Sequence, residues 1–128
     1  SISETFDPTM FARLSDDIGA LDRLVDSLAV AGGSDQLKLV CQRYYYAGLV
    51  ACIENLCLSP HGVSSIERSA RLHDMLEAQR TRQMVAALKG NHRGLGLFYG
   101  SIASAKPTRC ALYTHLAAFF NRSGARTV

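Results

Sequence analysis

Tryptophan is absent from this chain of 128 residues, and aromatic residues of all kinds make up only 8% of it. A core with so few large rings has to be built mainly from leucine, valine, isoleucine, methionine and alanine. Such a mixture favours helices, because strands are enriched in β-branched and aromatic residues. Hydrophobic residues make up 48% and charged residues 20%, a balance that is typical of a globular protein and excludes wholesale disorder.

Long apolar runs are also missing from the chain. No stretch approaches the roughly 18 to 20 consecutive apolar residues that a membrane-spanning helix requires. The first residues lack the basic start and the apolar run of a secretory signal. We therefore expect no membrane association and a cytoplasmic location.

Cysteine pairs with metal-binding spacing are absent too. The chain has four cysteines, which are Cys41, Cys52, Cys57 and Cys110. They form no CxxC pair, and three of them lie within apolar stretches with helical character. This pattern predicts reduced thiols in the core, with no metal site and no cofactor. One histidine, His73, has a carboxylate one helical turn away at Glu77, and we interpret this pair as surface hydrogen bonding.

The first predicted helix begins at Asp7, a good N-cap, with Pro8 in its first position, and ends at Gly32 and Gly33. Its apolar residues follow alternating spacings of three and four. They are Phe11, Leu14, Ile18, Leu21, Val25 and Leu28. This heptad seam predicts a narrow stripe of the kind that packs in a helical bundle.

The second predicted helix runs from Ser34 to about Leu58 and is apolar nearly all round. A helix of this kind is either central in its domain or covered by a partner chain. Three consecutive tyrosines, Tyr44 to Tyr46, point about 100° apart around the helix. At least one of their hydroxyls should therefore reach water, a neighbouring group or a ligand.

The second half of the chain predicts three further helices. Ser64 and Glu67 form a capping box that opens a helix through about Lys89, closed by Gly90. Residues 91–105 favour a helix, with a hairpin of strands over 94–103 as the alternative. In the helical reading Gly96, Gly100 and Ser104 form a groove of small residues for another helix. Pro107 stops that element, and Thr108 caps a last helix.

Charge is divided unevenly between the two halves. Residues 1–63 carry four basic and eight acidic groups, a net charge of −4, whereas residues 64–128 carry ten basic and three acidic groups, a net charge of +7. One hypothesis is a basic surface for nucleic acid. Its candidate residues are Arg80, Arg82, Lys89, Arg93 and Arg109. A second hypothesis, which we prefer to the first, is that the acidic first helix pairs with the basic later helices, within one chain or between two. The third and commonest case is a solvated surface on which the charge is merely uneven.

Arg68 and His73 lie on one predicted helix with four residues between them, an arrangement that resembles the catalytic motif of the HEPN superfamily of all-helical ribonucleases. The resemblance implies that His73 moves the proton of a ribose hydroxyl and that Arg68 neutralises the scissile phosphate, at a dimer interface. The chain departs from the family pattern at Ser69, where asparagine, aspartate or histidine is usual. Five positions also place the two side chains about 140° apart on an ideal helix.

A second resemblance lies near the C-terminal end. Residues 91–100 and the later residues of the last helix resemble the helix-turn-helix of Fis-type DNA-binding proteins. The residues that carry it in the last helix are Arg109, Leu112, Tyr113 and Leu116. The connection is several residues longer than in that motif and contains Lys106 and Pro107, so the tight turn that fixes the helix crossing is missing.

Together these patterns predict an all-α protein, a single domain over residues 1–128 with about five helices and with flexible ends at 1–6 and 121–128. We expect a non-catalytic module that works through self-association as a dimer, or through binding of a protein partner. The alternatives are a nucleic-acid-binding transcriptional regulator and a HEPN-like ribonuclease. The interface candidates are Phe11, Leu14, Ile18, Leu21, Val25, Leu28, Gly96 and Gly100.

Overall fold

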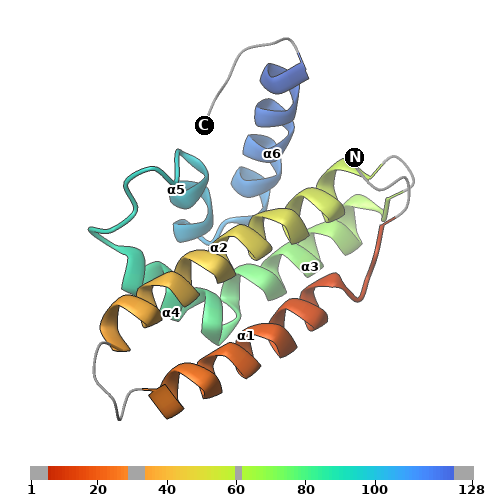
Figure 1. The fold of residues 1–128 in the computed structure, drawn as a ribbon. Helices are drawn as coiled ribbons and strands as arrows, with labels where there is room; N and C mark the ends of the chain where they lie inside the picture. Colours follow the sequence, from red (N-terminus) through yellow and green to blue (C-terminus); the bar gives the residue numbers. More distant parts are fainter. Residues whose placement is uncertain (1–5, 29–33, 60–61, 123–128) are drawn as a thin grey trace.

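The computed structural model describes residues 6–28, 34–59 and 62–122, and its described part contains helices and no strand (Figure 1). The helices are α1 (Met10–Leu28), α2 (Ser34–Leu58), α3 (Ser65–Glu77), α4 (Gln79–Leu88), α5 (Phe98–Ala103) and α6 (Pro107–Arg122). The predicted all-α class is therefore confirmed, with six helices in place of about five.

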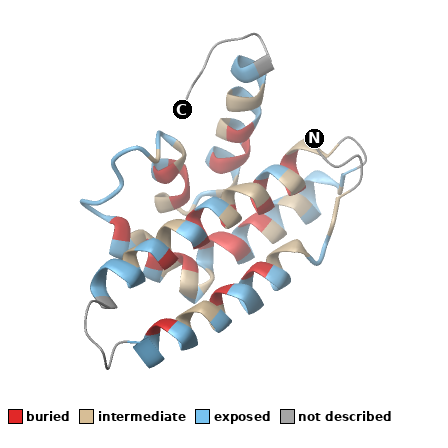
Figure 2. Cartoon of the chain, viewed as in Figure 1, coloured by how far each residue is buried: buried red, intermediate tan, exposed pale blue. Residues whose placement is uncertain are grey.

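The second helix, α2, lies at the centre of the fold, and α1, α3, α4 and α6 all pack against it. Leu49, Ile53 and Leu56 on α2 are fully buried, and Figure 2 shows the buried positions following α2 and α3. The prediction of a central second helix is confirmed. Its tyrosines divide as expected, because Tyr45 and Tyr46 are buried with bonded hydroxyls and Tyr44 is exposed.

The heptad seam of α1 packs against α2 of the same chain. Leu14, Ile18 and Val25 are buried there. Gly48 of α2 lets the two helices approach closely, because a Cβ at that position would overlap the Leu14 side chain. The seam is thus largely used within the domain, and Leu28 is the seam residue that remains exposed.

The N-terminal boundary of α1 differs from the prediction. The Asp7 carboxylate accepts from the Thr9 amide at 2.9 Å, two residues ahead, and the helix begins only at Met10. This is the bond that an N-cap makes with the second amide of its helix, but residues 8 and 9 form a turn before the regular helical bonds, which begin with the Arg13 amide and the Thr9 carbonyl at 3.0 Å. The predicted end of this helix at Gly32 and Gly33 lies outside the described residues.

The predicted helix from Ser64 to Lys89 is wrong in one respect, because it is two helices that meet at Ala78. Ala78 has an extended backbone, with ψ of 139°. The Thr81 hydroxyl donates to the Met75 carbonyl at 2.6 Å, and Arg82 donates to the Leu76 carbonyl at 2.8 Å. These side chains replace the backbone amides that would have continued the helix. The predicted end is confirmed, since Gly90 adopts φ of 84° just after α4.

Half of the predicted capping box forms at the start of α3. The Ser64 hydroxyl accepts from the Glu67 amide at 3.2 Å. The Glu67 carboxylate, instead of reaching back to Ser64, accepts from Arg71 one turn later at 2.9 Å. An oppositely charged side chain at this spacing is a stronger donor than a backbone amide.

Residues 91–97 form a loop, followed by the six-residue helix α5, so neither a long helix nor a hairpin is present here. Gly94 and Gly96 adopt φ of 87° and 72°, which glycine tolerates and a helix does not contain. The predicted groove of small residues is therefore wrong, because Gly96 precedes α5 and a Cβ on Gly100 would touch nothing within 4 Å.

The last helix, α6, begins with Pro107 in its first turn, where proline needs no amide donor. It extends through Asn121 and Arg122, which we had predicted to belong to a flexible end. Residues 1–5 and 123–128 lie outside the described residues. Figure 1 shows α6 rising away from the other helices. None of the described helices is long and apolar enough to cross a membrane.

Candidate binding surfaces

Two of the five residues proposed for nucleic acid are engaged inside the fold. Arg80 pairs with Asp22 of α1 at 3.0 Å and donates to Gln42 of α2 at 2.7 Å. Arg82 donates to the carbonyls of Leu76, Ile102 and Ala103. The Asp22–Arg80 pair joins the acidic first helix to the basic second half, as the preferred charge hypothesis expects.

The other three basic candidates are exposed and lie on separate elements. Lys89 ends α4, Arg93 belongs to the loop before α5, and Arg109 lies in the first turn of α6. The sequence analysis grouped these three residues because basic residues are abundant in the second half of the chain. That abundance does not place them on one surface of the fold. Nucleic-acid binding stays an untested alternative.

Arg68 and His73 do not share a site. Arg68 is half-buried and lines a cavity of about 360 Å³ between α3 and α6, whereas His73 is exposed and is not among the lining residues. The histidine that lines the cavity with Arg68 is His115 of α6. Sequence reasoning missed this pair because the two residues are 47 positions apart and meet only through the packing of α3 on α6.

The four cysteines are buried thiols. Burial raises the pKa of Cys52 and of Cys57 to about 11, and that of Cys110 to about 12. A thiol that stays protonated is a poor nucleophile and a poor metal ligand. Within the described ranges no cluster of three or more histidine, cysteine or acidic side chains is placed to hold a metal ion.

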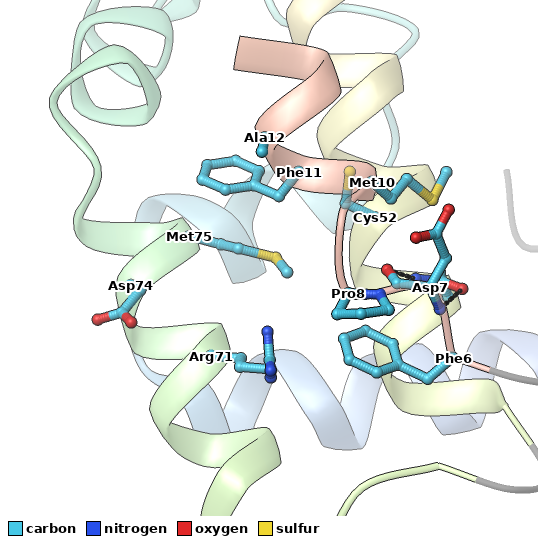
Figure 3. A pocket seen from close by; sticks show the side chains of 11 residues that line it. Phe6, Asp7, Pro8, Met10, Phe11, Ala12, Cys52, Arg71, Asp74 and Met75 are labelled. Carbon is cyan, nitrogen blue, oxygen red and sulfur yellow. Dashed lines mark hydrogen bonds between the residues drawn. The ribbon is translucent and has the colours of Figure 1, made fainter. Parts of the chain in front are cut away.

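A small pocket of about 200 Å³ lies where the chain before α1 crosses α2 and α3 (Figure 3). The side chain of Asn55 forms two hydrogen bonds with the backbone of Asp7. It donates to the Asp7 carbonyl at 3.0 Å and accepts from the Asp7 amide at 3.3 Å. The Arg71 guanidinium lies 5.0 Å from the centre of the Phe6 ring. These contacts hold the chain before α1 against α2 and α3.

A larger apolar groove of about 380 Å³ runs between α2, the loop before α5, and α6. Its α2 wall consists of one helix face, because the lining residues recur three or four positions apart. They are Arg43, Tyr46, Ala47, Val50 and Glu54. Burial raises the pKa of the Glu54 carboxyl, although the side chain keeps solvent contact. The loop is held in place by the Tyr46 hydroxyl, which donates to the Leu95 carbonyl at 3.0 Å.

The outer face of α6 adjoins this groove and is strongly apolar. Leu112 is 59% and Phe119 60% exposed, and Leu116 and Phe120 accompany them. The inner face of the same helix is buried at Cys110, Ala111 and Thr114. Figure 2 shows that exposed positions become more frequent towards the C-terminal end of α6.

The sequence carried a signal for this surface that the interface prediction did not use. Apolar residues occupy both sides of α6, which is one more side than its packing on the other described helices requires. Comparison of the chain with protein-family models, with curated protein sequences and with solved structures finds no match.

Proposed function

We propose that this protein is a non-catalytic helical module that works by self-association, with two chains pairing through α6. The observation that carries the proposal is the exposed apolar face of α6 beside the groove. A contiguous apolar surface of this kind marks an interaction site on a soluble domain.

The size of the surface supports a pair of chains. Five exposed apolar side chains contribute to it, namely Leu97, Leu112, Leu116, Phe119 and Phe120. With roughly 150–250 Å² for a whole large side chain, they expose on the order of 500 Å² together. A standard interface removes about 800 Å² from each partner, of which roughly 60% is apolar. The apolar area available thus matches what one side of a stable dimer buries.

Charge favours a second copy as the occupant. Glu54 is the carboxylate of the groove, which Ala117 and Asn121 of α6 also line. The α6 sequence contains arginines and a histidine but no acidic residue. In an antiparallel pair centred on Leu116, we expect Arg109 of a second copy to face the end of α6 whose Asn121 lines the groove with Glu54. The same patch then supplies both partners of the contact, as a two-fold interface requires.

The mass in solution tests this proposal. We expect light scattering at micromolar concentration to give twice the chain mass of 13.9 kDa. Leu116→Glu should shift the protein to monomer, because it places a carboxylate in the apolar contact. Ile66→Glu is the matched control, since Ile66 is 83% exposed on α3 and does not line the groove.

A charge reversal tests the orientation of the pair. Glu54→Arg and Arg109→Glu should each weaken the dimer, and the double variant should recover it. An unchanged protein that stays monomeric, or a dimer indifferent to Leu116→Glu, contradicts the proposal. Binding of a different protein by a monomer would then be the remaining use of the surface.

A further inference from the structure

Arg68 differs from the other half-buried arginines of the described chain. Four of these have acceptors for their guanidinium groups, and they are Arg43, Arg71, Arg80 and Arg82. In the part of the chain that the structure describes, Arg68 has neither a side-chain hydrogen bond nor an ion pair. A guanidinium presents five N–H donors, and those of Arg68 have only solvent in the cavity as their partner.

The cavity that Arg68 lines contains no carboxylate to fill this role. Its other polar side chains are the hydroxyls of Ser65, Ser69 and Thr108 and the imidazole of His115. The nearest acidic residue along α3, Glu67, already accepts from Arg71. The polar part of the lining therefore carries the positive charge of Arg68 and no negative charge, and each of its groups, from both α3 and α6, can donate a hydrogen bond.

We infer that this cavity binds a phosphate monoester of a small organic molecule. The forked guanidinium of Arg68 can donate hydrogen bonds to two phosphate oxygens. The hydroxyls and His115 line the same cavity and can donate to the third oxygen. Leu72, Ala111 and Leu112 form the apolar part of the lining. At about 360 Å³ the cavity has room for roughly ten waters, more than a bare phosphate ion fills, which leaves space for an organic group against these side chains.

This inference rests on a different cavity from the groove of the proposed dimer, although Leu112 borders both surfaces. Isothermal titration calorimetry with phenyl phosphate as the probe tests it, with phenol and inorganic phosphate as comparison ligands. We expect phenyl phosphate to bind more tightly than inorganic phosphate and phenol not to bind. Arg68→Gln should weaken phenyl phosphate binding at least tenfold, as expected for loss of a charge-assisted contact.

Two further variants make the result specific. Arg93→Gln removes one positive charge from an exposed loop residue outside the cavity and should leave the affinity unchanged. Ser69→Ala keeps the arginine and should weaken binding by a smaller factor, which keeps the test informative if Arg68→Gln fails to fold. The inference is overturned if phenyl phosphate does not bind, if it binds no better than inorganic phosphate, or if Arg93→Gln weakens it as much as Arg68→Gln.

Discussion

Replacing Arg82 with glutamine removes a guanidinium that ties three helices together. From α4 it donates to the Leu76 carbonyl at the end of α3 at 2.8 Å. It also donates to two carbonyls of α5, those of Ile102 at 2.7 Å and Ala103 at 3.2 Å. All three acceptors lie in the last turn of a helix, where backbone amides supply fewer donors, and the Ile102 carbonyl also accepts from the Ala105 amide at 3.1 Å.

The expected loss follows from these bonds. A hydrogen bond to a charged group contributes about 1.5–3 kcal/mol, but carbonyls at helix ends regain part of that from water, so the total should be about 2–4 kcal/mol. For a domain of this size that loss lowers the melting temperature by roughly 10 °C. Urea unfolding followed by circular dichroism, at fixed protein concentration, measures the change.

Two comparisons decide whether the reasoning is right. Arg93→Gln, which removes a charge in the exposed loop, should change the free energy of unfolding by less than about 0.5 kcal/mol. Arg82→Lys keeps the charge but cannot reach three carbonyls, so it should recover only part of the stability. The reasoning is refuted if Arg82→Gln unfolds like the unchanged protein, or if Arg82→Lys restores stability fully.

Three other predictions follow from the packing of α2. Gly48→Ala should lower the free energy of unfolding by about 1–3 kcal/mol, because the new Cβ overlaps Leu14. Gly19→Ala should instead raise it by about 0.5–1 kcal/mol, since its Cβ meets only Arg23 at 3.7 Å. Urea unfolding measures both changes, and equal effects would contradict the packing argument. Asn55→Ala should lower the free energy of unfolding by about 1–2 kcal/mol and should speed limited proteolysis before α1, because both hydrogen bonds to Asp7 are lost. An unchanged cleavage rate would show that these two bonds do not hold the segment in place. The contribution of Cys52, Cys57 and Cys110 to the free energy of unfolding should be full below pH 9 and should fall as the pH rises towards 11 and 12. The fall should be about 1.4 kcal/mol per pH unit for each thiol, because the thiols of the unfolded chain ionise first. Urea unfolding across this pH range measures the slope, with a cysteine-to-alanine variant as control.

The sequence was sufficient for features that depend on neighbours along the chain. The boundaries of α2 follow from an apolar pattern with turn residues on either side, and the start of α3 follows from Ser64 and Glu67. The end of α4 follows from Gly90, which supplies the left-handed conformation after the last turn. Each of these signals acts within a few residues, which is why periodicity and capping rules capture them.

The break at Ala78 and the site residues depend on contacts that such rules do not contain. No glycine or proline marks the break, which is held by Thr81 and Arg82 reaching back six residues. The cavity of Arg68 and His115 needs the packing of α3 on α6, and the use of Arg80 needs Asp22 from α1. Side chains that meet across helices follow from the topology, which the helical pattern alone leaves open.

A short polar chain inside the core has a consequence for how the helices align. The Tyr45 hydroxyl donates to the Thr81 hydroxyl at 2.8 Å, which in turn donates to the Met75 carbonyl. Sliding α4 along α2 by one turn, about 5.4 Å, would leave leucine and methionine side chains packed on similar neighbours. It would also strand these polar groups in the core, at about 1–3 kcal/mol for each. The apolar contacts therefore supply the driving force for folding, whereas Tyr45 and Thr81 select one register out of several that the core alone would accept.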